Sequence, residues 1–199
     1  HVDQRLDAIE AELPNLRAAL AYLAESGNAE SVLRISRALA VFWQLRGYLH
    51  EGAHWLAWGL AEADDQPTLT RGHALAGLAL LRWAQRDLPQ AAALAEASLA
   101  LGDQLQDLEV VTMAVHMLGL VAEVAQRWAE AEPLFTQSLQ GWRALGIQSA
   151  EAMTLHQLGD VSYGLGDRER ATHYSEASLA LFQTVGHAAG ACLALCRLA

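Results

Sequence analysis

The stretch His50-Glu51-Gly52-Ala53-His54 is the sharpest catalytic signal in this sequence. Two histidines four residues apart on a helix lie one turn apart and suit zinc, and the glutamate beside them can activate a water. At the start of a helix, however, Gly52 would face the packing side and both histidines would face solvent. No further histidine follows at the spacing of the extended zinc motifs. We therefore keep a zinc hydrolase through His50 and His54 as a remote alternative, and predict no metal, no cofactor and no catalytic residue.

The two cysteines, Cys192 and Cys196, are four residues apart near the end of the sequence. On a helix this spacing gives poor geometry for a disulfide. No second Cys or His cluster lies near enough in sequence to complete a zinc site with them. We expect reduced thiols in the core.

Composition narrows the classes of partner. The 199 residues include 13 basic and 23 acidic side chains, a net charge of −10, which argues against direct binding to a nucleic-acid backbone. The longest apolar run, near 74–81, is too short to cross a bilayer. The first 20 residues lack a basic region followed by an apolar core, so we expect no signal peptide. These features predict a cytoplasmic protein without nucleic-acid or membrane partners.

A spacing of 40 residues organises the chain. Leu78, Leu118 and Leu158 align at this spacing, and each is followed by a small residue. The small residues are Ala79, Gly119 and Gly159, and the other aligned sets are Ala91, Ala131 and Ala171; Ser98, Ser138 and Ser178; and Leu99, Leu139 and Leu179. Recurrence at a fixed period indicates a structural repeat. The small residues would let the two helices of each repeat approach closely.

This pattern resembles the tetratricopeptide repeat family in a form of about 40 residues per unit. The resemblance implies an all-α fold, a right-handed α-solenoid of antiparallel helix pairs. We expect one domain over 1–199, with an N-terminal helical cap at 1–27, repeats at 28–66, 67–107, 108–147 and 148–188, and a truncated fifth repeat at 189–199. The expected helices are about 14–26, 68–86, 88–104, 108–126, 128–145, 149–165 and 168–185. The helix around 126–139 resembles kinesin-light-chain repeats, so Pro133 should be tolerated inside it.

A second resemblance bears on function. The N-L-R-A-A-L string at 15–20, Trp43 with L-R-G at 45–47, E-G at 51–52 and W-L at 55–56 resemble a segment of large bacterial transcription regulators. In those signal-transduction ATPases, which include LuxR-type regulators, the segment follows the NTPase and DNA-binding modules and carries tetratricopeptide repeats. The resemblance implies a regulatory arm whose NTPase and DNA-binding modules lie outside these residues.

The first helices of such repeats line a concave surface, so their residues outside the core register are the candidates for binding. These are Arg34, Arg37, Gln44, His73, Trp83, Met113, His116, Met117, Glu123, Met153, His156, Gln157, Asp160 and Tyr163. A groove of Met, His, Trp and Tyr suits a peptide, a small molecule or another domain. The alternative is that several of these residues, above all Met113 and Met153, belong to the core between repeats.

The leading hypothesis is a non-enzymatic sensor and scaffold domain of a bacterial transcription regulator, binding a protein, a peptide or a small effector. A free-standing adaptor that binds peptides in its groove is the alternative. The segment 190–199 carries Leu193, Leu195 and Leu198, and we expect it either to fray or to form a weak dimer through this apolar stripe.

Overall fold

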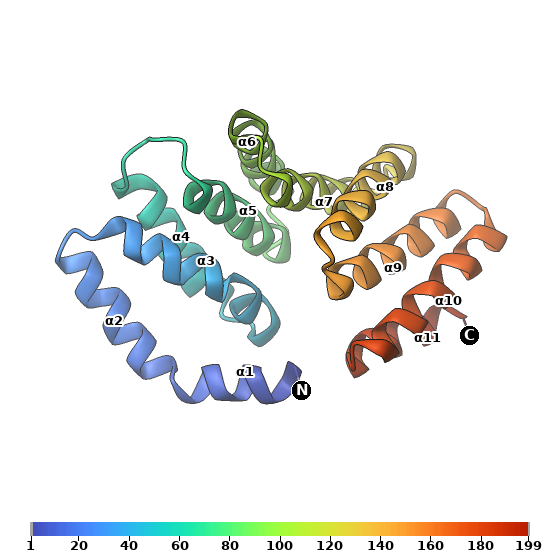
Figure 1. Cartoon of the computed structure of the whole chain (residues 1–199), viewed down its shortest axis with the longest axis horizontal. Helices are drawn as coiled ribbons and strands as arrows, with labels where there is room; N and C mark the ends of the chain where they lie inside the picture. Colours follow the sequence, from blue (N-terminus) through green and yellow to red (C-terminus); the bar gives the residue numbers. More distant parts are fainter. Residues whose placement is uncertain (1, 199) are drawn as a thin grey trace. The chain divides into compact units, whose positions relative to one another are not determined.

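The computed structural model describes residues 2–198, and this part of the chain is built of eleven α-helices without a strand (Figure 1). The helices are α1 (Val2–Ala11), α2 (Leu13–Glu25), α3 (Ala29–Arg46), α4 (Leu49–Glu62), α5 (Leu69–Ala84), α6 (Leu88–Leu105), α7 (Leu108–Val124), α8 (Trp128–Leu145), α9 (Gln148–Gly164), α10 (Arg168–Thr184) and α11 (Ala188–Leu198). The all-α fold of helix pairs is confirmed, and the helix bounds agree closely with those expected from the sequence. Pro133 lies inside α8, as predicted.

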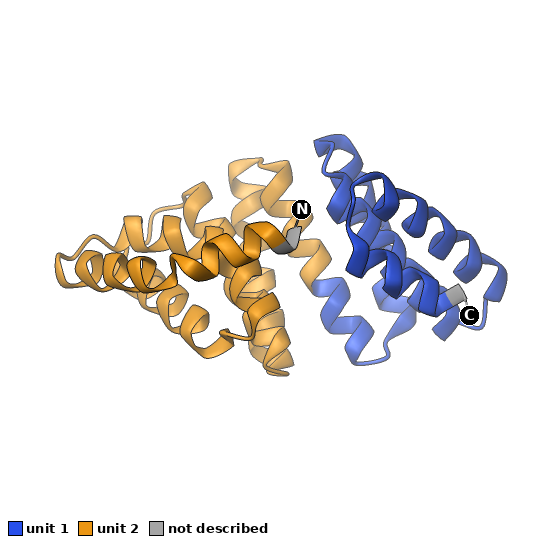
Figure 2. Cartoon of the chain, turned by 90° about the horizontal axis from the view of Figure 1, so that it is seen from below, with its two compact units in different colours: residues 1, 118–199 blue, residues 2–117 orange. Residues whose placement is uncertain are grey.

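The chain forms two compact units, 2–117 and 118–199, which meet within α7 (Figure 2). The pairs α3 with α4 and α5 with α6 lie in unit 2–117, and the pair α9 with α10 lies in unit 118–199. Helix α11 packs against α10 and α9. The expectation of one continuous domain over 1–199 stays a prediction.

Side-chain caps explain where several helices begin. Asn28, Asp87 and Asp167 precede α3, α6 and α10, and each accepts a hydrogen bond from the backbone N–H three residues later, at 3.2, 3.2 and 3.0 Å. Such a bond satisfies one of the donors that the first turn of a helix leaves without a partner. Two of them, Asp87 and Asp167, directly precede the helices expected at 88–104 and 168–185.

The turn between the helices of a pair uses one left-handed residue. It is Gly166 in the last pair, with φ +85°, whereas Gln126 and Arg86 occupy the equivalent positions with φ +56° and +66°. A residue with a Cβ atom is strained in this region of backbone space, and glycine is not. The two earlier turns therefore hold a strained residue at a position where the last pair has glycine.

The small residues predicted at the helix crossings are in close contact. A Cβ atom added to Gly119 would lie 2.7 Å from the Phe135 ring, and one added to Gly159 would lie 2.9 Å from Ser175 Oγ. The added atom at Gly159 would also lie 3.4 Å from the Ala171 carbonyl oxygen, so the backbones of α9 and α10 approach closely here, as predicted. At Gly119 the nearest side chain is Phe135, which the repeat alignment did not indicate.

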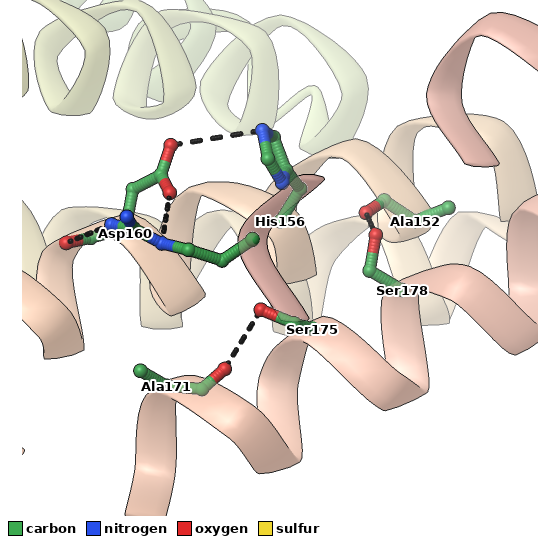
Figure 3. A network of polar contacts seen from close by, with 7 residues as sticks. Ala152, His156, Asp160, Ala171, Ser175 and Ser178 are labelled. Carbon is green, nitrogen blue, oxygen red and sulfur yellow. Dashed lines mark hydrogen bonds and ion pairs between the residues drawn. The ribbon is translucent and has the colours of Figure 1, made fainter. Parts of the chain in front are cut away.

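Two of the aligned serines join the helices of a pair. Ser98 on α6 donates to the Gly72 carbonyl on α5 at 2.9 Å, and Ser178 on α10 donates to the Ala152 carbonyl on α9 at 2.8 Å (Figure 3). Both serines are fully buried. Gly72 and Ala152 are 80 residues apart, which is two repeats, so the same bond recurs between equivalent positions.

Helix α11 buries one narrow stripe. Ala194 and Gly190 are buried, whereas Leu193 and Leu195 are 48% and 50% exposed. Cys192 and Cys196 are free and exposed, so the expectation of core thiols is wrong. Only the residues in register with Ala194 reach α10 and α9, because the helix packs on one side only.

Candidate binding surface

We call the surface of the first helices of the pairs, α3, α5, α7 and α9, the first-helix surface. Of the fourteen candidates on it, Arg34, Arg37 and Tyr163 are exposed, and Gln44, His73, Trp83, Met113, His116, Glu123, Met153, His156 and Asp160 are half-buried. The last two, Met117 and Gln157, are buried, with 5% and 8% of their surface exposed.

Met117 and Gln157 are corrections to the predicted surface. Each directly precedes an aligned leucine and shares the buried stripe of its helix. Gln157, for example, is three residues after Thr154 and four before Val161, and both of these are fully buried. Residues three and four apart lie on one face of a helix, so both side chains turn inward.

In unit 2–117 the exposed candidates on this surface are basic. Arg34 and Arg37 on α3 are exposed, and neither forms an ion pair with another described residue. Burial lowers the pKa of His73 on α5; the nearby carboxylates of Glu109 and Asp107 oppose this shift, and Arg37 reinforces it. His73 therefore remains neutral close to a positive side chain.

His116 on α7 belongs to the same unit. Burial lowers the pKa of its imidazole to about 4, because desolvation disfavours the charged form. The ring is therefore neutral at pH 7.

In unit 118–199 two candidates, Asp160 and Tyr163, contact a residue that the sequence reasoning missed, Arg197 on α11. The Arg197 Nε atom forms an ion pair with Asp160 Oδ1 at 2.8 Å, and its Nη2 atom donates to the Asp160 carbonyl at 3.5 Å. The guanidinium lies 4.1 Å from the centre of the Tyr163 ring. On the other side of the carboxylate, His156 Nε2 lies 3.6 Å from Asp160 Oδ2 (Figure 3). Asp160 is thus shared between a guanidinium and an imidazole.

Glu123 on α7 lies within electrostatic reach of this cluster. Burial and the negative charge of Asp160 raise the pKa of Glu123 to about 7, against the opposing effect of Arg197. Among the described residues, none forms a hydrogen bond or an ion pair with its carboxylate. Glu123 is therefore a half-buried acid that is only partly ionised at neutral pH.

The His50-to-His54 stretch is held by structural contacts. The Glu51 carboxylate accepts two hydrogen bonds from Arg17, from Nε at 2.8 Å and from Nη2 at 2.6 Å. His50 Nδ1 lies 3.3 Å from Gln85 Nε2, and the exposed His54 ring contacts Trp55 edge-on. In the described part of the chain, no three His, Cys, Asp or Glu side chains are grouped to hold a metal ion.

The glycine of this stretch has a packing role. A Cβ atom on Gly52 would lie 2.5 Å from the ring of the fully buried Trp43 and 2.8 Å from Leu81. Trp43 and Leu56 belong to one hydrophobic core cluster, and Trp55 packs against it, so the Trp43, E-G and W-L parts of the regulator-like pattern all contribute to this core.

None of the helices in the described residues is long and apolar enough to cross a membrane.

Comparison with known proteins agrees with this architecture. Residues 109–184 match the sequence profile of the tetratricopeptide repeat family. A relative, the regulatory protein AfsR of Streptomyces coelicolor, is 25% identical over 160 residues, which cover 77% of this chain and 16% of AfsR. The chain thus spans only a small part of the length of that relative.

Two solved structures share the fold. One is a signal-transduction ATPase with numerous domains and a tetratricopeptide repeat sensor from Pyrococcus horikoshii, with a TM-score of 0.71, 17% identity, and coverage of 96% of this chain and 30% of the other. The second contains nearly identical tetratricopeptide-like repeats of a putative kinesin light chain from Podospora anserina, with a TM-score of 0.61, 20% identity, and coverage of 78% and 77%. Residues 109–184 are thus similar to tetratricopeptide repeats, and the chain is similar to part of a regulatory protein.

Proposed function

We propose that this domain is the non-enzymatic sensor arm of a bacterial transcription regulator, acting in the cytoplasm. The observation that carries the proposal is the similarity to AfsR over 77% of the chain, together with helix pairs that form a tetratricopeptide repeat domain. By this proposal the first-helix surface binds a protein, a peptide or a small effector. Binding would change the activity of NTPase and DNA-binding modules joined to the domain.

Contacts around the sharpest catalytic motif support a role without catalysis. A metal-dependent hydrolase needs a glutamate free to activate water, whereas Glu51 is held by both ends of the Arg17 guanidinium. His156 and Asp160 resemble the imidazole and carboxylate of a catalytic acid–base pair, but Asp160 also forms an ion pair with Arg197. These side chains organise a surface, and we propose no reaction for them.

The reading frame of the gene tests the regulatory role. We expect it to continue into a nucleotide-binding module with a glycine- and lysine-containing phosphate loop and into a helix-turn-helix module. A frame holding only repeats would contradict the regulator and favour the alternative, a free-standing adaptor that binds peptides.

Self-association through α11 is a separate proposal. Leu193 and Leu195 are about half exposed on this helix, so apolar side chains are available for a weak dimer. Light scattering of the chain with and without 190–199 tests it, and equal dimerisation of both would contradict it.

A further inference from the structure

Helix α1 contributes no fully buried side chain among its residues 4–11. Its apolar side chains Leu6 and Ile9 are half-buried against the hydrophobic core cluster of the unit. Helix α2, by contrast, places Leu13 and Leu20 inside this core, with 4% and 1% of their surface exposed. A helix of ten residues is marginal in water by itself. The helical structure of α1 therefore depends on its contacts with the rest of the unit.

A group of polar contacts holds α1 against the end of α3. The Arg46 guanidinium on α3 forms ion pairs with Asp7 and Glu10 of α1, and its Nε atom lies 3.1 Å from Glu10 Oε2. The Tyr48 hydroxyl, in the turn before α4, donates a hydrogen bond to Glu10 Oε1 at 3.0 Å. The two acidic side chains are 69% and 39% exposed, so salt in the solvent screens these ion pairs.

A hinge lies between α1 and α2. The chain changes direction at Glu12, which joins the two helices (Figure 1). Pro14, at the start of α2, has no N–H group to donate to the carbonyl of Glu10 four residues before it. The ladder of helical hydrogen bonds is therefore interrupted here, and α1 is free to turn about 12–14 while Leu13 and Leu20 keep α2 in the core.

We infer that α1 is a strap that closes on the end of α3 through Asp7, Glu10 and Arg46 and opens at the hinge over 12–14. In the closed state α1 is helical and its two carboxylates neutralise Arg46. In the open state α1 loses its helix, and Arg46 and Tyr48 are uncovered. High salt shifts the equilibrium towards the open state. This inference goes beyond the proposed function and does not depend on it.

The test is hydrogen–deuterium exchange of the 199-residue chain in 10 mM and 1 M NaCl at constant pH. The Debye length falls from about 30 Å to about 3 Å between these conditions, so the ion pairs of the strap are screened. We expect the amides of 4–11 to exchange at least about fivefold faster in 1 M salt. The amides of α2 should change less than about twofold, because buried apolar side chains hold this helix.

Three variants separate the contacts. Arg46→Met removes the guanidinium and keeps an apolar stem, so at 10 mM salt it should accelerate exchange in α1 at least about fivefold and remove the effect of salt. Tyr48→Phe removes one hydrogen bond and keeps the ring, so its effect on α1 should be smaller, about twofold. The matched control is Arg143→Met, which breaks the Arg143–Glu151 ion pair in the other unit and should leave α1 unchanged.

Unchanged exchange in α1, both in 1 M salt and in Arg46→Met, would overturn the inference, because apolar contacts would then hold the helix. Equal acceleration in α1 and α2 would exclude the hinge, since the two helices would open together. Exchange of α1 at the rate of an unstructured chain in 10 mM salt would show that the strap does not close. If Arg46→Met also loses protection in α3, the salt series and Tyr48→Phe decide between these outcomes.

Discussion

The charged candidates of the first-helix surface differ in sign between the two units, although both units are built from the same kind of helix pair. Unit 2–117 exposes Arg34 and Arg37 on α3, whereas unit 118–199 presents Glu123 and Asp160. Several core residues recur at the 40-residue spacing, such as Ala91, Ala131 and Ala171, whereas Arg37 and Glu123 lie outside this pattern. The repeat thus determines the scaffold, and we propose that residues outside the repeat pattern determine which partner each unit binds.

The buried ionisable groups of the two units differ in the same way. In unit 2–117 burial removes water from a basic side chain, His116, and in unit 118–199 it removes water from an acidic side chain, Glu123. Desolvation favours the neutral form of each group, so it lowers one pKa and raises the other. The two units should therefore respond to pH in opposite directions.

The largest effect is expected at His116. Its folded pKa of about 4 lies below the unfolded value of 6.5, so the unfolded chain binds more protons between these values and stability falls as pH decreases through them. The loss by pH 4.5 should be about 2–3 kcal/mol. Urea unfolding at pH 7 and pH 4.5 measures it, and His116→Gln should remove this part of the loss.

His173→Gln is the matched control, because this histidine is exposed on α10. If the free energy of unfolding falls by the same amount from pH 7 to pH 4.5 in the His116→Gln and His173→Gln variants, burial of His116 does not cause the effect.

A smaller effect of opposite sign is expected at Glu123. Its folded pKa of about 7 lies above the model value of 4.5, so its favourable contribution is complete below pH 4.5 and is lost as pH rises through 7. Since the carboxylate also reaches solvent, Glu123→Gln should raise the free energy of unfolding by only about 1–2 kcal/mol at pH 8, and by less at pH 5. Stabilisation that is equal at both pH values would show that ionisation is not the cause.

The smallest effect concerns the turns, where the last pair has glycine and the two earlier pairs do not. Gln126→Gly should stabilise the chain by about 0.5–1 kcal/mol, because glycine relieves the left-handed strain although it adds entropy to the unfolded chain. Gly166→Ala should have the reverse effect. Thermal unfolding measures both, and a destabilised Gln126→Gly variant would show that the glutamine side chain stabilises the turn.

Local sequence signals predicted the helices well. Gly166 and Asp167 lie between the helices expected at 149–165 and 168–185, and the structure has its turn and its helix cap at these residues, because turn and cap chemistry is local. The 40-residue spacing predicted the close approach at Gly159, since the same contact recurs in each repeat.

The surface was harder to predict, because side-chain burial depends on the width of each packed stripe and on distant residues. Counting from Leu158 placed Gln157 outside the core, although it shares a face with Thr154 and Val161. Arg197 was missed because its contact with Asp160 spans 37 residues and no local pattern encodes it.

The central claim is that the first-helix surface, and not the surface of the second helices, binds the partner or effector. A thermal-shift screen of peptides and metabolites against the parent chain, Tyr163→Ala and Arg37→Ala, with His173→Ala as the second-helix control, tests it directly. We predict that each compound that raises the melting temperature of the parent loses this effect in Tyr163→Ala or Arg37→Ala and keeps it in His173→Ala. Loss of the effect in His173→Ala, with both first-helix variants responding like the parent, would contradict the claim.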